Sequence, residues 1–273
     1  MSDEYLATGF SDVDSAENIN SYADCLSLLD SLSYFKEYKH RTYELLELGP
    51  SDSVLDAGCG LGDDVFRMAE LIVPGGFVVG LDSSAKLIDK AKSDERSAAL
   101  PVEFLIGDLR RLPFSDQTFT RCRIDRVLQH VSEPQIVISE LVRVLKPGGI
   151  LLAYDNDWGT FSITSDNQRV TRMLENAWCD SFANSWIGRE LRGYFIRAGL
   201  WNVNIYPSVS LISDLDTADQ VYNLRQTVQR AIAAREISEP AGEAWLAELQ
   251  ARARSGSFAA ALIAYIAIGR KAS

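Results

Sequence analysis

Short β-rich runs alternate with amphipathic stretches between residues 50 and 155, and this alternation limits the folds open to the chain. Stretches with apolar residues at helical spacing fall between the runs, at about 63–73, 84–96 and 133–146. Strand and helix units in alternation favour a parallel sheet with helices on both faces, so we predict an α/β fold. The runs are VLDAG (54–58), FVVGLD (77–82), VEFLIGD (102–108), a run near 119–127 and ILLAYD (150–155).

The charge balance argues against nucleic acid as a partner. The formal net charge is −11 and the isoelectric point is about 4.7, whereas phosphate neutralisation needs clustered Lys and Arg. The longest apolar run, at 258–269, is too short to span a bilayer, and no signal peptide opens the sequence. We therefore expect no nucleic-acid partner and no membrane insertion.

Cysteine and histidine usage gives no sign of a metal site. The four cysteines are scattered without a CxxC pair, and the chain has only two histidines. Neither a disulfide framework nor a zinc site is therefore expected, and a cytoplasmic location fits the free thiols. The cysteines are Cys25, Cys59, Cys122 and Cys179.

A glycine-rich turn, residues 58–62, follows the first predicted strand, where open α/β sheets bind their ligands. A dinucleotide fingerprint is GxGxxG, with pyrophosphate at the helix N-terminus. Here the spacing is GxGxG, and Asp63 and Asp64 follow it. Each carboxylate beside a pyrophosphate would be unfavourable by on the order of 4 kcal/mol at an effective dielectric of 20. The turn thus predicts a phosphate-free cofactor and disfavours the alternative of an NAD-dependent oxidoreductase.

S-adenosylmethionine fits this turn, because it has a sulfonium, an ammonium, a carboxylate and a ribose but no phosphate. The ribose should require an acidic residue at the end of the second strand, and Asp82 stands there. A Gly107-Asp108 step follows the third strand. These three features occur in the expected order. A tight connecting turn that binds no ligand would not explain them.

These stretches resemble the class I S-adenosylmethionine-dependent methyltransferases, close to the small-molecule enzymes of ubiquinone and menaquinone biosynthesis. The resemblance covers roughly residues 50–155 and implies a Rossmann-like sheet of seven strands, mostly parallel with the last strand antiparallel. Residues 200–212 and 258–268 would be strands six and seven. The matching stretches are VLDAGCGLG, VVGLDSSAKLIDKA, VEFLIGDLRRLPFSDQTF, DRVLQHVSEP and ISELVRVLKPGGILL.

The resemblance also implies which residues bind the cofactor. Four would surround its methionine portion, three would bind or pack on the ribose and adenine, and two would contact the adenine. A backbone group of Arg126, after the fourth strand, would face the methionine portion. In that order the other residues are Asp56, Gly58, Gly60 and Gly62, then Asp82, Ser83 and Leu87, then Asp108 and Leu109.

The predicted fourth strand, TRCRID, departs from the family pattern. It places Arg121, Arg123 and Asp125 on one face at a period of two, which is unusual in a central strand. Either that face meets carboxylates or the strand boundary is shifted by one residue.

Methyl transfer to a hydroxyl requires removal of a proton, and His130 is the candidate base. Its acid partner would be Asp155 or Asp157, of which Asp157 matches the family better. The equally weighted alternative is that His130 only packs at the start of a helix, and both carboxylates could be loop or cap residues. If His130 is the base for a hydroxyl acceptor, its change to Ala should reduce turnover by ~100-fold or more.

Two stretches lie outside the common sheet. Residues 1–49 form a predicted N-terminal helical cap, and residues 50–273 form the methyltransferase domain with a helical insertion at about 213–257. Either stretch could be a lid that selects the substrate, a homodimer interface or extra core. We expect methyl transfer to an O, C or N atom of a small aromatic, quinone-like or secondary-metabolite acceptor. The alternative within the same fold is a cyclase or scaffold that binds S-adenosylmethionine without transferring its methyl group.

Overall fold

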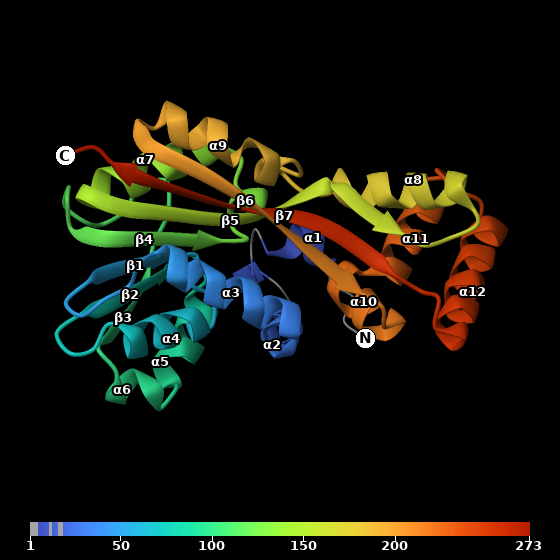
Figure 1. The fold of residues 1–273 in the computed structure, drawn as a ribbon. Helices are drawn as coiled ribbons and strands as arrows, with labels where there is room; N and C mark the ends of the chain where they lie inside the picture. Colours follow the sequence, from blue (N-terminus) through green and yellow to red (C-terminus); the bar gives the residue numbers. More distant parts are fainter. Residues whose placement is uncertain (1–4, 11–12, 16–18) are drawn as a thin grey trace.

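A computed structural model describes residues 5–10, 13–15 and 19–273, which are built on one seven-stranded sheet (Figure 1). The strand order is β3-β2-β1-β4-β5-β7-β6. β1 to β5 are parallel, whereas β7 is antiparallel to both of its neighbours. The predicted Rossmann-like α/β sheet is confirmed. The strands are β1 (Ser53–Ala57), β2 (Phe77–Asp82), β3 (Val102–Ile106), β4 (Phe119–Asp125), β5 (Leu145–Ile163), β6 (Leu200–Ile212) and β7 (Ala260–Lys271).

Helices cover both faces of the sheet, because successive strand residues point to opposite sides and both sides are apolar. In β1, Val54 belongs to the core under α4 and α5, and Leu55 belongs to the core under α7 and α9. Figure 1 shows these two helical layers. The helices of this part are α1 (Leu6–Gly9), α2 (Ile19–Ser31), α3 (Ser33–Leu45), α4 (Asp63–Leu71), α5 (Ala85–Ser93), α6 (Arg96–Ala99), α7 (Pro134–Val144) and α9 (Ile187–Arg197).

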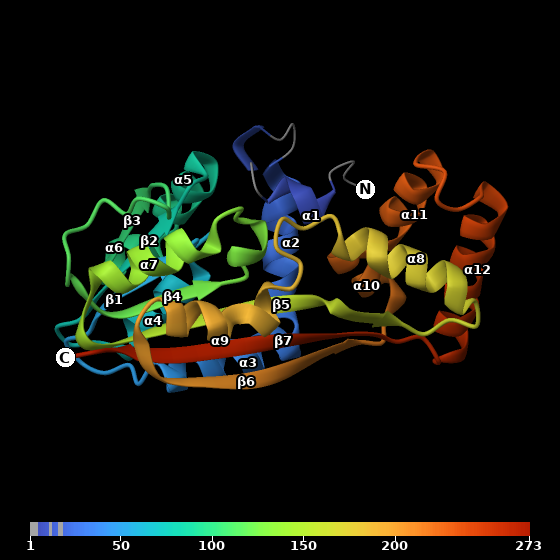
Figure 2. The ribbon, with the colours of Figure 1, turned by 90° about the horizontal axis from the view of Figure 1, so that it is seen from above.

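The last three strands are long and carry a second group of helices at their far ends (Figure 2). β5 runs to Ile163, well beyond the expected end at residue 155, so Asp155 and Asp157 lie in a strand, and the alternative of a loop or a helix cap is wrong. The predicted helical insertion contains three helices. The far helices are α8 (Gln168–Cys179), α10 (Leu215–Tyr222), α11 (Leu224–Ala233) and α12 (Glu239–Ser255).

The first described residues lie between these two helical groups (Figure 2). We call residues 5–10 and 13–15 the strap; it contains α1 and the short 3-10 turn η1 (Val13–Ser15). Among all described helices, none has the length and apolar character needed to cross a bilayer.

Candidate functional site

The glycine turn after β1 has a backbone that only glycine adopts easily. Gly58, Gly60 and Gly62 have φ values of +77°, +54° and +82°. A Cβ atom on Gly58 would lie 2.3 Å from Val127, and one on Gly62 would lie 2.6 Å from Phe104. The turn therefore brings bare backbone to the carboxyl ends of the strands, where the chain connections diverge on either side of β1.

A cavity of about 650 Å³ opens beside this turn, and its volume lies within the usual range for ligand sites. It brings together eight of the ten residues expected to hold the cofactor, together with His130. Asp56 and Gly62 do not line it. Gly62 instead precedes α4 and packs against Phe104. The eight are Gly58, Gly60, Asp82, Ser83, Leu87, Asp108, Leu109 and Arg126.

Asp82 ends β2 with both carboxylate oxygens oriented by the backbone. One oxygen accepts the N–H of Gly60 and the other accepts the N–H of Ser84, each at 2.9 Å. Burial raises the pKa of this carboxyl above its ordinary value, although these backbone N–H groups oppose the shift. Each oxygen keeps a lone pair, so the group can accept hydrogen bonds from two adjacent ribose hydroxyls.

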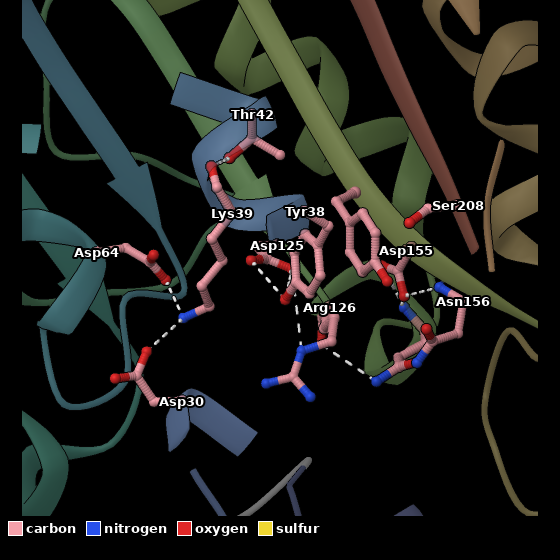
Figure 3. A network of polar contacts seen from close by, with 12 residues as sticks. Asp30, Tyr38, Lys39, Thr42, Asp64, Asp125, Arg126, Asp155, Asn156 and Ser208 are labelled. Carbon is pink, nitrogen blue, oxygen red and sulfur yellow. Dashed lines mark hydrogen bonds and ion pairs between the residues drawn. The ribbon is translucent and has the colours of Figure 1, made fainter. Parts of the chain in front are cut away.

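The two carboxylates after the turn line a small cavity of about 60 Å³ with Gly58 and Gly60, and each carboxylate has a cation partner. Asp63 forms an ion pair with Arg96 at 3.0 Å, and Asp64 pairs with Lys39 at 2.7 Å and Arg123 at 3.4 Å. Figure 3 shows Lys39 between Asp30 and Asp64. Burial would raise the pKa of Asp64, but the two cations outweigh burial and hold it well below its ordinary value. These cation partners weaken the predicted repulsion between the two carboxylates and a phosphate.

Arg123 explains the unusual pattern of β4. Its guanidinium is buried and binds Asp56 at 3.0 Å and Asp125 at 2.6 Å, in addition to Asp64. The polar face of β4 therefore meets carboxylates. This is the first of the two predicted explanations, and a shift of the strand boundary is not needed. Burial raises the pKa of Asp56 to about 6 even though Arg123 opposes the shift. Asp56 lines the same small cavity as Gly58, Gly60 and Arg126.

A second cavity, of about 60 Å³, adjoins the first. Both are lined by Phe10, Arg126, Gln129 and His130. The strap closes one side, and strands β5, β6 and β7 form another. Seven more aromatic residues line this cavity: Tyr34, Phe35, Tyr154, Trp158, Trp178, Phe182 and Tyr222.

His130 lies on the wall that the two cavities share, but it is held tightly. Its Nε2 lies 3.0 Å from the side-chain amide nitrogen of Gln129, which can only donate. The ring also donates to the backbone carbonyl of Ala7 in the strap, so Nδ1 carries the proton. Burial and the nearby Arg126 lower the pKa of His130 to about 4, despite the bond to Ala7. The imidazole is neutral and both of its nitrogens have partners.

The structure does not bring Asp157 to His130. Asp157 lines neither cavity, and its Oδ2 accepts from Nε of Arg189 at 2.6 Å. Asp155, the other candidate, accepts the backbone N–H groups of Gln129 at 3.3 Å and Asn156 at 3.1 Å. It therefore supports the 3-10 turn η2 (Leu128–His130) rather than the histidine ring. Burial raises the pKa of Asp155 to about 8.

Sequence reasoning missed the contacts of the strap. Asp14 accepts from the Ser84 hydroxyl at 2.5 Å and the Ala85 N–H at 2.8 Å, at the N-terminus of α5. At its other end, the Leu6 N–H donates to the Asn223 side chain at 2.9 Å. The strap thus connects the cofactor side of the molecule to the far helices. No local pattern marks Asp14 as a contact residue.

Comparison with known proteins agrees with this geometry. A family model described as a methyltransferase domain matches residues 48–225. An uncharacterized 37.1 kDa protein in transposon TN4556 of Streptomyces fradiae is 34% identical over 252 residues, or 92% of this chain and 70% of that protein. A demethylmenaquinone methyltransferase of Bacillus cereus is 28% identical over 207 residues, which cover 70% of this chain and 87% of the enzyme.

Solved structures share the fold. A putative methyltransferase from Bacillus halodurans superimposes with a TM-score of 0.61 at 19% identity, over 86% of this chain and 99% of that one. The [4+2]-cyclase SpnF gives a TM-score of 0.53 at 22% identity, over 87% of this chain and 81% of that one. At these identities both likenesses concern the fold alone.

Proposed function

The chain belongs to the methyltransferase domain family and uses S-adenosylmethionine as its methyl donor, and on that premise we propose that its acceptor is a small aromatic or quinone-like molecule. One observation carries the proposal: the cofactor cavity shares four lining residues with a second cavity that has an aromatic wall. Family membership also removes the oxidoreductase alternative.

The residues present fit the donor. Asp82 presents carboxylate oxygens to a ribose, and the exposed Asp108 can accept from the adenine amine while it binds Arg110 at 2.8 Å. The carboxylates that line the small cavity beside the glycine turn, among them Asp56 and Asp125, suit an ammonium. When bound, S-adenosylmethionine supplies a methyl group whose transfer forms a bond to the acceptor atom, breaks the S–CH₃ bond and leaves that electron pair on sulfur.

The protein's own contribution is to position the acceptor and exclude water. Flat aromatic side chains such as Trp158 and Phe182, stacked at 4.5 Å between ring centroids, favour an apolar ring through burial and stacking. Alignment of the two reactants lowers the barrier without a covalent role for the enzyme. The second cavity is small in this closed form, so the strap must move to admit an acceptor. The four cysteines are unpaired, which supports a cytoplasmic setting.

The test is to incubate the protein with methyl-labelled S-adenosylmethionine and fractionated small metabolites, and to follow the label by mass spectrometry. Ser210, a buried residue of the second cavity, is changed to Phe to fill that cavity, and the exposed Ser162→Phe serves as its control. Asp82→Ala removes the ribose ligand. Binding of S-adenosylhomocysteine is measured by calorimetry in every variant.

We expect the wild type and Ser162→Phe to label one low-molecular-weight product. Ser210→Phe should bind S-adenosylhomocysteine normally yet lose at least tenfold in labelling, because the acceptor has no room. Asp82→Ala should lose both binding and labelling. Label found only on macromolecules, or labelling unaffected by Ser210→Phe, would contradict the proposal. Cofactor binding without any labelled product would favour the cyclase or scaffold alternative.

A further inference from the structure

Arg126 lies where the two cavities meet, with its backbone fixed in a left-handed conformation at φ +56°. Its N–H donates to the Tyr154 carbonyl at 2.8 Å, and its carbonyl accepts from the Gln129 side chain at 3.3 Å. A non-glycine residue held in this region commonly marks a functional constraint. The backbone therefore fixes the direction in which the guanidinium leaves β4.

The guanidinium has no hydrogen-bond partner among the described residues. Its buried Nε makes no hydrogen bond, and the nearest carboxylate oxygen, on Asp125, lies 3.9 Å away. That carboxylate already binds Arg123 at 2.6 Å. On its other side Arg126 faces the ring of Phe35, 5.1 Å from the centroid. The buried Nε without an acceptor is costly, whereas the side chain as a whole is 19% exposed and can reach a ligand in the cavities that it lines.

The surrounding charges indicate the sign of that ligand. Within the described residues, Arg126 belongs to a connected cluster of four cations and four carboxylates, which is neutral overall. S-adenosylmethionine, with a sulfonium, an ammonium and a carboxylate, adds one positive charge. A single anion would restore neutrality. The cluster consists of Lys39, Arg67, Arg123, Arg126, Asp30, Asp56, Asp64 and Asp125.

We propose that the Arg126 side chain binds an anionic oxygen of the methyl acceptor, so that the acceptor is a phenol, enol or carboxylic acid bound in its ionised form. This inference rests on the proposed function and deepens it by naming the acceptor class. The acceptor gives its proton to water before it binds, and no protein base is needed. A guanidinium presents several donors to such an oxygen in a low-dielectric wall, where the interaction is strong.

The competing ligand for Arg126 is the carboxylate of the cofactor, and the experiment separates the two. Protein saturated with S-adenosylhomocysteine is titrated with 4-nitrophenol across a pH series, because its phenolate absorbs visible light. Benzoate and its neutral isostere benzamide form a second pair of probes. The variants are Arg126→Gln, Arg126→Lys, which keeps the charge, and the control Arg143→Gln on α7, whose ion pairs with Glu140 and Asp116 lie outside both cavities.

In the wild type we expect the pKa of bound nitrophenol to fall by about one unit or more, and benzoate to bind at least tenfold more tightly than benzamide. Arg126→Gln should abolish both the fall in the pKa of bound nitrophenol and the tighter binding of benzoate. It should change the affinity for S-adenosylhomocysteine less than threefold. Arg126→Lys should retain most of the preference, and Arg143→Gln all of it.

The proposal is overturned if the wild type shows no preference for anions or binds none of these probes. It is also overturned if Arg126→Gln weakens S-adenosylhomocysteine tenfold or more while the preference for anions persists, because the cofactor carboxylate would then be the partner. None of these measurements requires turnover. Failure of the proposed function would appear separately, as label on macromolecules or no labelled product.

Discussion

Arg189 binds the buried carboxylate of Asp157, with 2.6 Å between Nε and Oδ2. The other oxygen, Oδ1, has no hydrogen-bond partner among the described residues. This ion pair gives Asp157 a structural role and leaves His130 without an acid partner.

Arg189→Gln is therefore expected to lower the free energy of unfolding by about 1–3 kcal/mol, because it leaves a buried carboxylate without its charge partner. The rate of methyl transfer should change less than threefold. Urea denaturation and the labelling assay measure the two effects. A loss of turnover near 100-fold in a folded Asp157→Asn variant would instead show that the Asp157 carboxylate takes part in catalysis.

His130→Asn should reduce kcat by less than tenfold. A base contributes about 10²–10⁴-fold, but an imidazole whose pKa is lowered to about 4 and whose nitrogens are both occupied is a poor base. The pH profile of kcat should be the same in the wild type and the variant, with no limb near pH 6.5 in either. A limb near pH 6.5 that the wild type shows and the variant lacks would mean that proton transfer through His130 is part of the reaction.

Asp155 should make the protein less stable as the pH rises. Its pKa is raised to about 8 in the folded state, so the folded protein binds a proton that the unfolded chain has lost. Between pH 6.5 and 9 the wild type should lose at most about 2 kcal/mol through this group. The melting temperature of Asp155→Asn should not show this decline. If the melting temperatures of the two proteins fall equally with rising pH, a group other than Asp155 causes the pH dependence.

Asp14→Ala should loosen the strap, because the N-terminus of α5 loses its carboxylate. Dissociation of S-adenosylhomocysteine, followed by stopped-flow fluorescence, is expected to accelerate by about tenfold if this contact is worth about 1.4 kcal/mol. Asp24→Ala, at an exposed position of α2, is the matched control. Unchanged dissociation would mean that the strap does not retain the cofactor.

Arg123→Met should destabilise the fold by about 3–5 kcal/mol, since it leaves Asp56, Asp64 and Asp125 without a shared cation. The double variant Arg123→Met with Asp56→Asn should recover part of this loss. Denaturation of the wild type, the two single variants and the double variant gives the coupling energy. Additive effects would show that Asp56 and Arg123 do not interact.

The sheet and the position of Asp82 could be predicted because both depend on local patterns. Alternating periodicity marks strands and helices, and a carboxylate at the end of β2 needs no distant partner to be recognised. The partners of Arg123, Asp157 and Asp14 could not be found in this way. Asp14, for example, binds Ser84, and no periodicity connects positions so far apart in the sequence. The substrate side of the site depends mostly on such distant contacts.

The strap also has a consequence for how the protein matures. Its first residues bind Asn223 and Thr227, more than two hundred residues later in the chain. During synthesis the sheet strands β1 to β5 are made long before those partners exist, and contacts at such separation form late in folding. A chain that ends with α10 therefore lacks both contacts of the strap with Asn223 and Thr227.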